Sequence, residues 1–205
     1  MNTILGRKLG MTQIFDDEGR AIPVTVVSAG PCTVVQRKSK ERDGYDALQI
    51  GYEAAKEKHL SRARVGHCKA AGVAPVRLLT EIRLDEPSDL AVGDEITVAA
   101  FSAGDVVKVA GRSKGRGFQG VVRRHGHHGG RKTHGSHFHR APGSIGASAD
   151  PSRVRKGTKL PGHMGDRRMT VKNLQVIEVL PEDNLLLIRG GLPGAVNGLL
   201  RITGA

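Results

Sequence analysis

The chain has 205 residues, a formal net charge of +12 and an isoelectric point near 10.2. This length allows one or two domains, and the charge predicts an acidic partner: nucleic acid or an anionic membrane surface. Six aromatic residues and no tryptophan exclude a base-stacking platform, while the absence of long apolar runs and of a basic amphipathic helix speaks against a membrane.

Short apolar stretches separated by turn residues predict strands through the first half of the chain. Ser61 is a predicted N-cap of a helix that ends before Gly72. We expect His67 to lie on the half-buried face of this helix. The predicted strands are Met11 to Phe15, Ala21 to Ser28, Thr33 to Arg37, Asp46 to Tyr52, Val76 to Leu84, Glu95 to Ala99 and Val106 to Val109.

The last part of the chain also contains predicted strands. Val171 to Leu180 is rich in branched residues, and Pro181 to Asn184 predicts a turn into Leu185 to Arg189. Leu199 to Ile202 is the last predicted strand. Many short strands with one clear helix predict a mainly β fold, a small barrel or a Greek-key sandwich.

The surplus charge lies in one internal segment, Gly111 to Met169. It contains 14 of the 32 lysine and arginine residues, only two of the 20 acidic residues, 13 of the 28 glycines and seven of the nine histidines. Its scattered apolar residues cannot form a core, whereas arginine, lysine and glycine suit the wrapping of a polyanion. We therefore predict a globular domain of residues 1–110 plus 170–205, interrupted by an extended basic finger of residues 111–169.

Two motifs in the finger suggest other chemistry. Gly115 to Gly120 matches the dinucleotide-binding pattern G-x-G-x-x-G, but the acidic residue expected about 20 positions later is missing. Six histidines between His125 and His139 suggest zinc, yet neighbouring arginines and the lack of a nearby cysteine favour contacts with RNA phosphates. A histidine-cluster metal-binding protein and a general basic nucleic-acid chaperone remain alternatives. Cys32 and Cys68 have no framework spacing, and we expect reduced thiols in a cytoplasmic protein.

Four segments together resemble the universal family of large-subunit ribosomal protein L-three, in its bacterial form. They are Leu5 to Phe15, Gly111 to Arg124, His139 to Gly146 and Lys156 to Gly165. The resemblance covers nearly the whole chain in the right order.

The resemblance implies a translation-protein-type β-barrel with one or two short helices and a long irregular RNA-binding extension. It implies a structural constituent of the large subunit and not an enzyme, with no cofactor, metal or small-molecule substrate. The implied partners are the 23S rRNA, especially its 3′ region, and the neighbouring proteins L-fourteen and L-nineteen. The family binds early in assembly and sends its extension toward the peptidyl transferase centre.

The predicted rRNA-binding residues combine this resemblance with the charge pattern. An almost uncharged tip, with Ser148, Ala149 and Asp150, is expected where the extension reverses direction. The predicted contacts are Arg7, Lys8, Arg112, Ser113, Lys114, Arg116, Arg123, Arg124, His125, His127, His128, Arg131, Lys132, His134, His137, His139, Arg140, Arg153, Arg155, Lys156, Lys159, His163, Arg167 and Arg168.

Overall fold

The structure, a computed structural model, describes residues 2–204. The chain forms two compact units. The first contains the residues up to Arg112 together with those from Arg168 onward, and the second is Ser113–Arg167.

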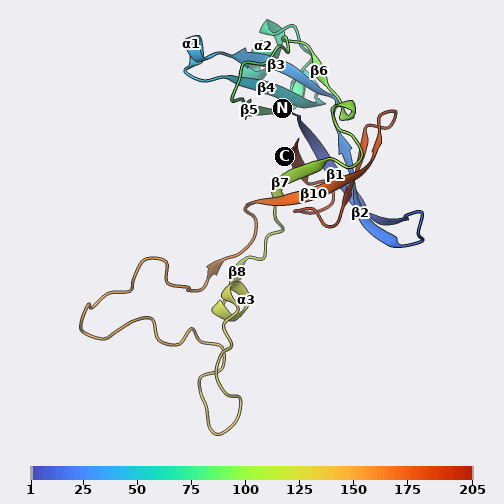
Figure 1. Cartoon of the computed structure of the whole chain (residues 1–205). Coiled ribbons are helices and arrows are strands. Elements are labelled where there is room, and N and C mark those ends of the chain that lie inside the picture. Colours follow the sequence, from blue (N-terminus) through green and yellow to red (C-terminus); the bar gives the residue numbers. More distant parts are fainter. Residues whose placement is uncertain (1, 205) are drawn as a thin grey trace. The chain divides into compact units, whose positions relative to one another are not determined.

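The first unit is built on a closed antiparallel barrel of six strands in the order β1-β12-β7-β10-β11-β2 (Figure 1). The predicted mainly β fold with a small barrel is therefore confirmed. The strands are β1 (Thr3–Phe15), β2 (Ala21–Ala29), β7 (Val106–Arg112), β10 (Arg168–Leu180), β11 (Leu185–Arg189) and β12 (Leu199–Gly204).

A four-stranded antiparallel sheet completes the first unit, in the order β5-β4-β3-β6. Its strands are β3 (Cys32–Lys38), β4 (Ala47–Ala54), β5 (Val76–Arg83) and β6 (Glu95–Ile96). One continuous core joins barrel residues such as Ile4 and Ile188 to sheet residues such as Val34 and Ile50, and all four are fully buried. The barrel and this sheet therefore share one hydrophobic core.

Helix α2 (Arg62–Ala70) covers the other face of the sheet, where Cys68 packs with Val35 and Val76. Ser61 accepts a hydrogen bond from the Arg64 amide, as the predicted N-cap should. At the other end Gly72 has a φ of +67°, and its amide donates to the Lys69 carbonyl at 3.0 Å. A glycine is favoured there because a left-handed residue closes the helix. Both predicted helix ends are confirmed.

The remaining helical elements are short: α1 (Lys40–Asp43), α3 (Val121–His125) and the 3-10 turns η1 (Glu57–His59) and η2 (Val98–Ala100). In the described part of the chain, none of the helices has the length and apolar character needed to cross a membrane.

The largest differences from the predicted strands are in β1 and β6. β1 begins at Thr3, not at Met11. The sequence pattern did not predict residues 3–10 as a strand because glycine and lysine interrupt the apolar alternation before Met11. Gly6 is required there, since a Cβ would lie 2.7 Å from the Ser28 carbonyl oxygen of β2. The strand predicted from Glu95 ends at Ile96, and the chain then turns through η2 to bury Phe101.

Candidate nucleic-acid interface

The second unit begins and ends in two chain segments that run antiparallel. The Ser113 amide donates to the Arg167 carbonyl at 2.9 Å, and the Arg116 amide donates to Met164 at 2.9 Å. Strands β8 (Phe118–Gln119) and β9 (Gly162–His163) continue this pairing. The backbone itself therefore holds the outgoing and returning segments together.

Helix α3 is fixed to the returning segment. Val121 is buried, and the Arg124 guanidinium donates to the Leu160 carbonyl at 2.6 Å, with His125 Nε2 at 3.1 Å from the same oxygen. Gly162 leaves room for this contact, because a Cβ would lie 2.7 Å from Arg124 Nη1. Arg124 and His125, both predicted to bind RNA, thus have partners inside the unit.

A second close approach joins Gly129 and Gly130 to the stretch around His139. The Gly130 amide donates to the His139 carbonyl at 3.1 Å, and the His139 ring lies 3.1 Å from the Arg131 carbonyl. A Cβ on Gly130 would come within 1.9 Å of the Phe138 carbonyl oxygen. The two strands of chain can meet here only because glycine has no side chain.

Residues 126–161 are otherwise largely coil (Figure 1), and every residue from 139 to 157 is exposed. This range includes the predicted tip residues Ser148, Ala149 and Asp150. Asp150 is also the only acidic residue between Asp105 and Asp166. The basic side chains of this stretch therefore have almost no negative charge of their own segment to neutralise them.

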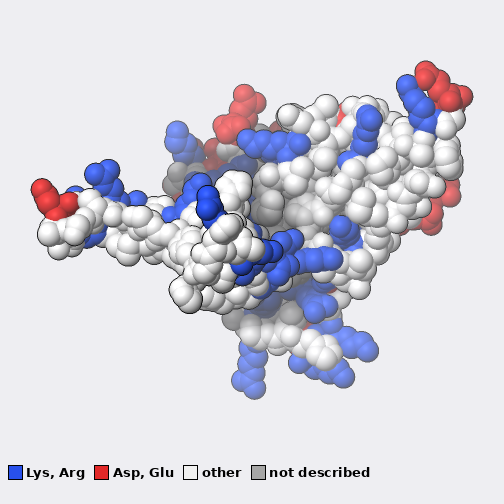
Figure 2. Space-filling model, turned by 90° about the horizontal axis from the view of Figure 1, so that it is seen from below, with Lys and Arg blue, Asp and Glu red and all other residues white. Residues whose placement is uncertain are grey.

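Most of the predicted RNA-binding side chains are accessible. Ser113, Arg124, His125 and His127 are half-buried. The exposed ones are Arg112, Lys114, Arg116, Arg123, His128, Arg131, Lys132, His134, His137, His139, Arg140, Arg153, Arg155, Lys156, Lys159, His163, Arg167 and Arg168. Figure 2 shows lysine and arginine side chains standing out from the surface into solvent, where a polyanion can reach them.

Arg201 on β12 is a basic residue that the sequence pattern did not single out. It is half-buried, and its pKa is lowered by burial and by the nearby charge of Arg168. Only the strand order shows that Arg201 and Arg168 lie on the two strands that flank β7 in the barrel.

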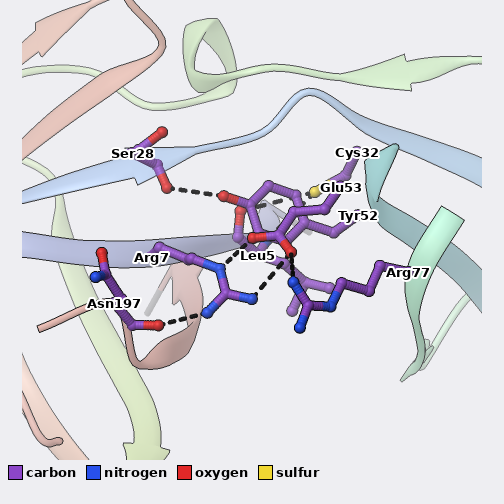
Figure 3. A network of polar contacts seen from close by, with 8 residues as sticks. All are labelled: Leu5, Arg7, Ser28, Cys32, Tyr52, Glu53, Arg77 and Asn197. Carbon is purple, nitrogen blue, oxygen red and sulfur yellow. Dashed lines mark hydrogen bonds and ion pairs between the residues drawn. The ribbon is translucent and has the colours of Figure 1, made fainter. Parts of the chain in front are cut away.

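Arg7 and Lys8 have partners inside the first unit. Lys8 is buried, and its Nζ donates to the Leu192 carbonyl at 3.1 Å. Arg7 makes two hydrogen bonds to the Glu53 carboxylate and one to the Asn197 carbonyl (Figure 3). Arg77 Nη1 lies 3.8 Å from the same carboxylate. The side chains of Arg7 and Lys8 are therefore both engaged within the first unit.

The Arg7–Glu53 pair should make folding depend on pH. Hydrogen bonds from Arg7 hold the pKa of Glu53 below its ordinary value. The ionised carboxylate therefore stabilises the folded chain at pH values above its unfolded-state pKa of about 4.3. This stabilisation is lost as the pH falls through the lowered pKa of the folded state. Urea unfolding should show Glu53→Gln to be less stable than wild type at neutral pH, with a smaller difference at pH 3. Glu18→Gln, at an exposed turn, should be as stable as wild type at both pH values. An equal loss of stability in the two variants would contradict a stabilising role for the Arg7–Glu53 pair.

The histidine cluster is spread out in the structure. His125 and His127 have ring centroids 6.1 Å apart. Within residues 2–204, no three histidine, cysteine, aspartate or glutamate side chains are gathered as a metal site would require.

Comparison with known proteins places the chain in a family. Residues 83–190 match the family described as "Ribosomal protein L3". The chain is 54% identical to the large ribosomal subunit protein uL3 of Brachyspira pilosicoli over 202 residues, covering 98% of this chain and 93% of that protein. It is 55% identical to the Geobacter metallireducens protein of the same name, over 96% of this chain and 94% of that protein. The Oceanobacillus iheyensis protein is 54% identical, with 98% and 96% covered. The chain belongs to the ribosomal protein L3 family.

Proposed function

We propose that residues 113–167, the extension, bind the large-subunit rRNA. The extension contains 12 lysine and arginine residues and only two acidic residues, Asp150 and Asp166, and all of these cations except Arg124 are exposed. This uncompensated charge is the observation that carries the proposal, because phosphates supply the missing negative charge.

Family membership gives the wider setting. The chain is a structural constituent of the large ribosomal subunit, in the cytoplasmic ribosome of bacteria, and its family is not one of enzymes. Within that setting we propose four finer points from the resemblance. The chain binds the 3′ region of the 23S rRNA, does so early in assembly, directs the extension toward the peptidyl transferase centre, and contacts the proteins L-fourteen and L-nineteen.

The mechanism is architectural. The paired backbone at Ser113 and Arg167 and the contact of α3 with Leu160 give the extension defined local structure. Beyond them, the exposed cations from Arg131 to Lys159 lie on a glycine-rich coil that can follow RNA grooves. Each arginine can bridge phosphates of RNA segments that would otherwise repel one another.

A competition experiment tests this function. The full chain is bound to a labelled fragment from the 3′ region of the 23S rRNA and challenged with unlabelled fragment, unrelated structured RNA or duplex DNA, all at one salt concentration. We expect the matching rRNA to compete best, because phosphate contacts arranged on a defined scaffold fit one RNA shape. Equal competition by all three would instead indicate a general nucleic-acid chaperone.

A further inference from the structure

The strands β1 and β2 extend beyond their neighbours in the barrel. β12 pairs with β1 only from Thr3 to Arg7, and Lys8 exchanges the last hydrogen bonds with residues 197 and 198. β11 pairs with β2 from Val24 to Ser28. Within the described residues, residues 9–15 of β1 therefore have a strand on one side only. We call the other side of this stretch the outer edge of β1.

The backbone groups on the outer edge can be assigned from Pro23. Gln13 lies opposite Pro23, which has no amide proton and whose carbonyl accepts from Gly190 on the far side of β2. Gln13 and Pro23 are thus not hydrogen-bonded to each other. Because antiparallel pairs alternate, the amides and carbonyls of Met11, Gln13 and Phe15 point to the outer edge.

The side chains along this edge are unusually apolar for an exposed strand. Met11 and Phe15, on one face of the strand, are 55% and 65% exposed, and Leu9 at the neighbouring bulge is 44% exposed. An unpaired edge with apolar side chains is a template for another strand. Proteins recognise extended peptides in this way, through backbone hydrogen bonds and alternate side-chain contacts.

Charge identifies the kind of partner. The turn at the end of the β1–β2 hairpin contains Asp16, Asp17 and Glu18, with Arg20 as the one cation, and Arg20 is paired with both Asp16 and Glu18. The net negative turn repels phosphate, so RNA is disfavoured here. An apolar polypeptide strand carrying a lysine or arginine complements both features.

We infer that the outer edge of β1 binds an extended segment of a neighbouring protein by strand addition. The segment has apolar side chains at alternate positions and a basic residue beside the acidic turn. The inference rests on the proposed place of the chain in the large subunit, and it adds the surface and the mode of contact.

Hydrogen exchange resolved to single amides tests the inference. It compares the free chain with purified large subunits. Exchange at Met11, Gln13 and Phe15 should slow by about tenfold or more in the subunit, because these amides gain partners. Thr12 and Ile14, which already face β2, serve as internal controls and should change much less. Equal rates at Met11, Gln13 and Phe15 in both samples would overturn the inference; absence of the chain from the subunits would instead overturn the proposed function.

Two further measurements identify the occupant. A photo-cross-linking phenylalanine analogue placed at position 15 should attach to a mapped peptide of another ribosomal protein, and attachment to rRNA would overturn the inference. Sedimentation of the free chain should show a monomer. A dimer that Gln13→Pro dissociates would show that a second copy fills the edge and would also overturn it.

A pair of variants isolates the backbone contact. Gln13→Pro removes an outward amide that β2 does not use, whereas Gln13→Ala retains it. In competition with wild type during assembly, Gln13→Pro should be incorporated about threefold to tenfold less than wild type, which is the effect of one lost hydrogen bond. Gln13→Ala should be incorporated as well as wild type. Incorporation of Gln13→Pro equal to wild type would overturn the inference. Thermal unfolding of the free variants checks folding, and the wild-type exchange data decide the question if Gln13→Pro does not fold.

Discussion

Replacing Arg131, Arg140, Arg153 and Arg155 by alanine should make rRNA binding much less sensitive to salt. All four side chains are exposed in the extension. Each phosphate contact releases condensed counterions, so losing four should reduce the log–log slope of the binding constant against salt by about 3 units. The measurement is a salt titration of the affinity for the 3′ rRNA fragment, with wild type and variant side by side.

The matched control removes the same charge from the first unit. Lys40, Arg42, Lys56 and Lys58 are also exposed, and their replacement by alanine lowers the net charge equally. The control variant should retain a slope close to that of wild type, because only charges near the RNA displace counterions. If both variants lose the same slope, general charge and not the extension governs binding. If the extension variant keeps the wild-type slope, the extension is not at the interface.

The barrel could be predicted from the sequence because its signals are local. Branched apolar residues and the turn at Pro181 to Asn184 define the β10–β11 hairpin within about 20 positions, and the structure pairs Leu180 with Leu185. Ser61 and Gly72 define α2 equally locally. Each of these elements carries its own periodicity and its own boundary residues.

What the sequence could not give depends on distant pairing. Lys8 follows Arg7 in a basic pair that looks exposed, yet its partner Leu192 lies 184 positions away. Arg201 likewise gains its neighbour Arg168 only through the strand order of the barrel. In the extension, the distribution of charge was readable directly, but the internal contact of Arg124 with Leu160 required the returning segment to be placed beside α3.

Removing most of the extension should abolish specific rRNA binding and leave the first unit folded. The buried core cluster lies wholly in the first unit, and Val121 is the only residue of the extension classed as buried among those described. Ser113 and Arg167 are hydrogen-bonded across from each other at 2.9 Å. A two-residue Asn-Gly turn can therefore join them in place of residues 114–166, because this turn matches the twist of antiparallel strands.

The deletion variant should unfold cooperatively, with a midpoint within about 4 °C of wild type, the shift that roughly 1 kcal/mol produces in a domain of this size. Its affinity for the 3′ rRNA fragment should fall to that for unrelated RNA, since the uncompensated cations are gone. Calorimetry tests the cooperative unfolding, and the binding assay independently tests the loss of specific affinity. A broad, non-cooperative transition would show that the extension stabilises the barrel, whereas a folded variant with unchanged specific affinity would move the RNA-binding surface to the first unit.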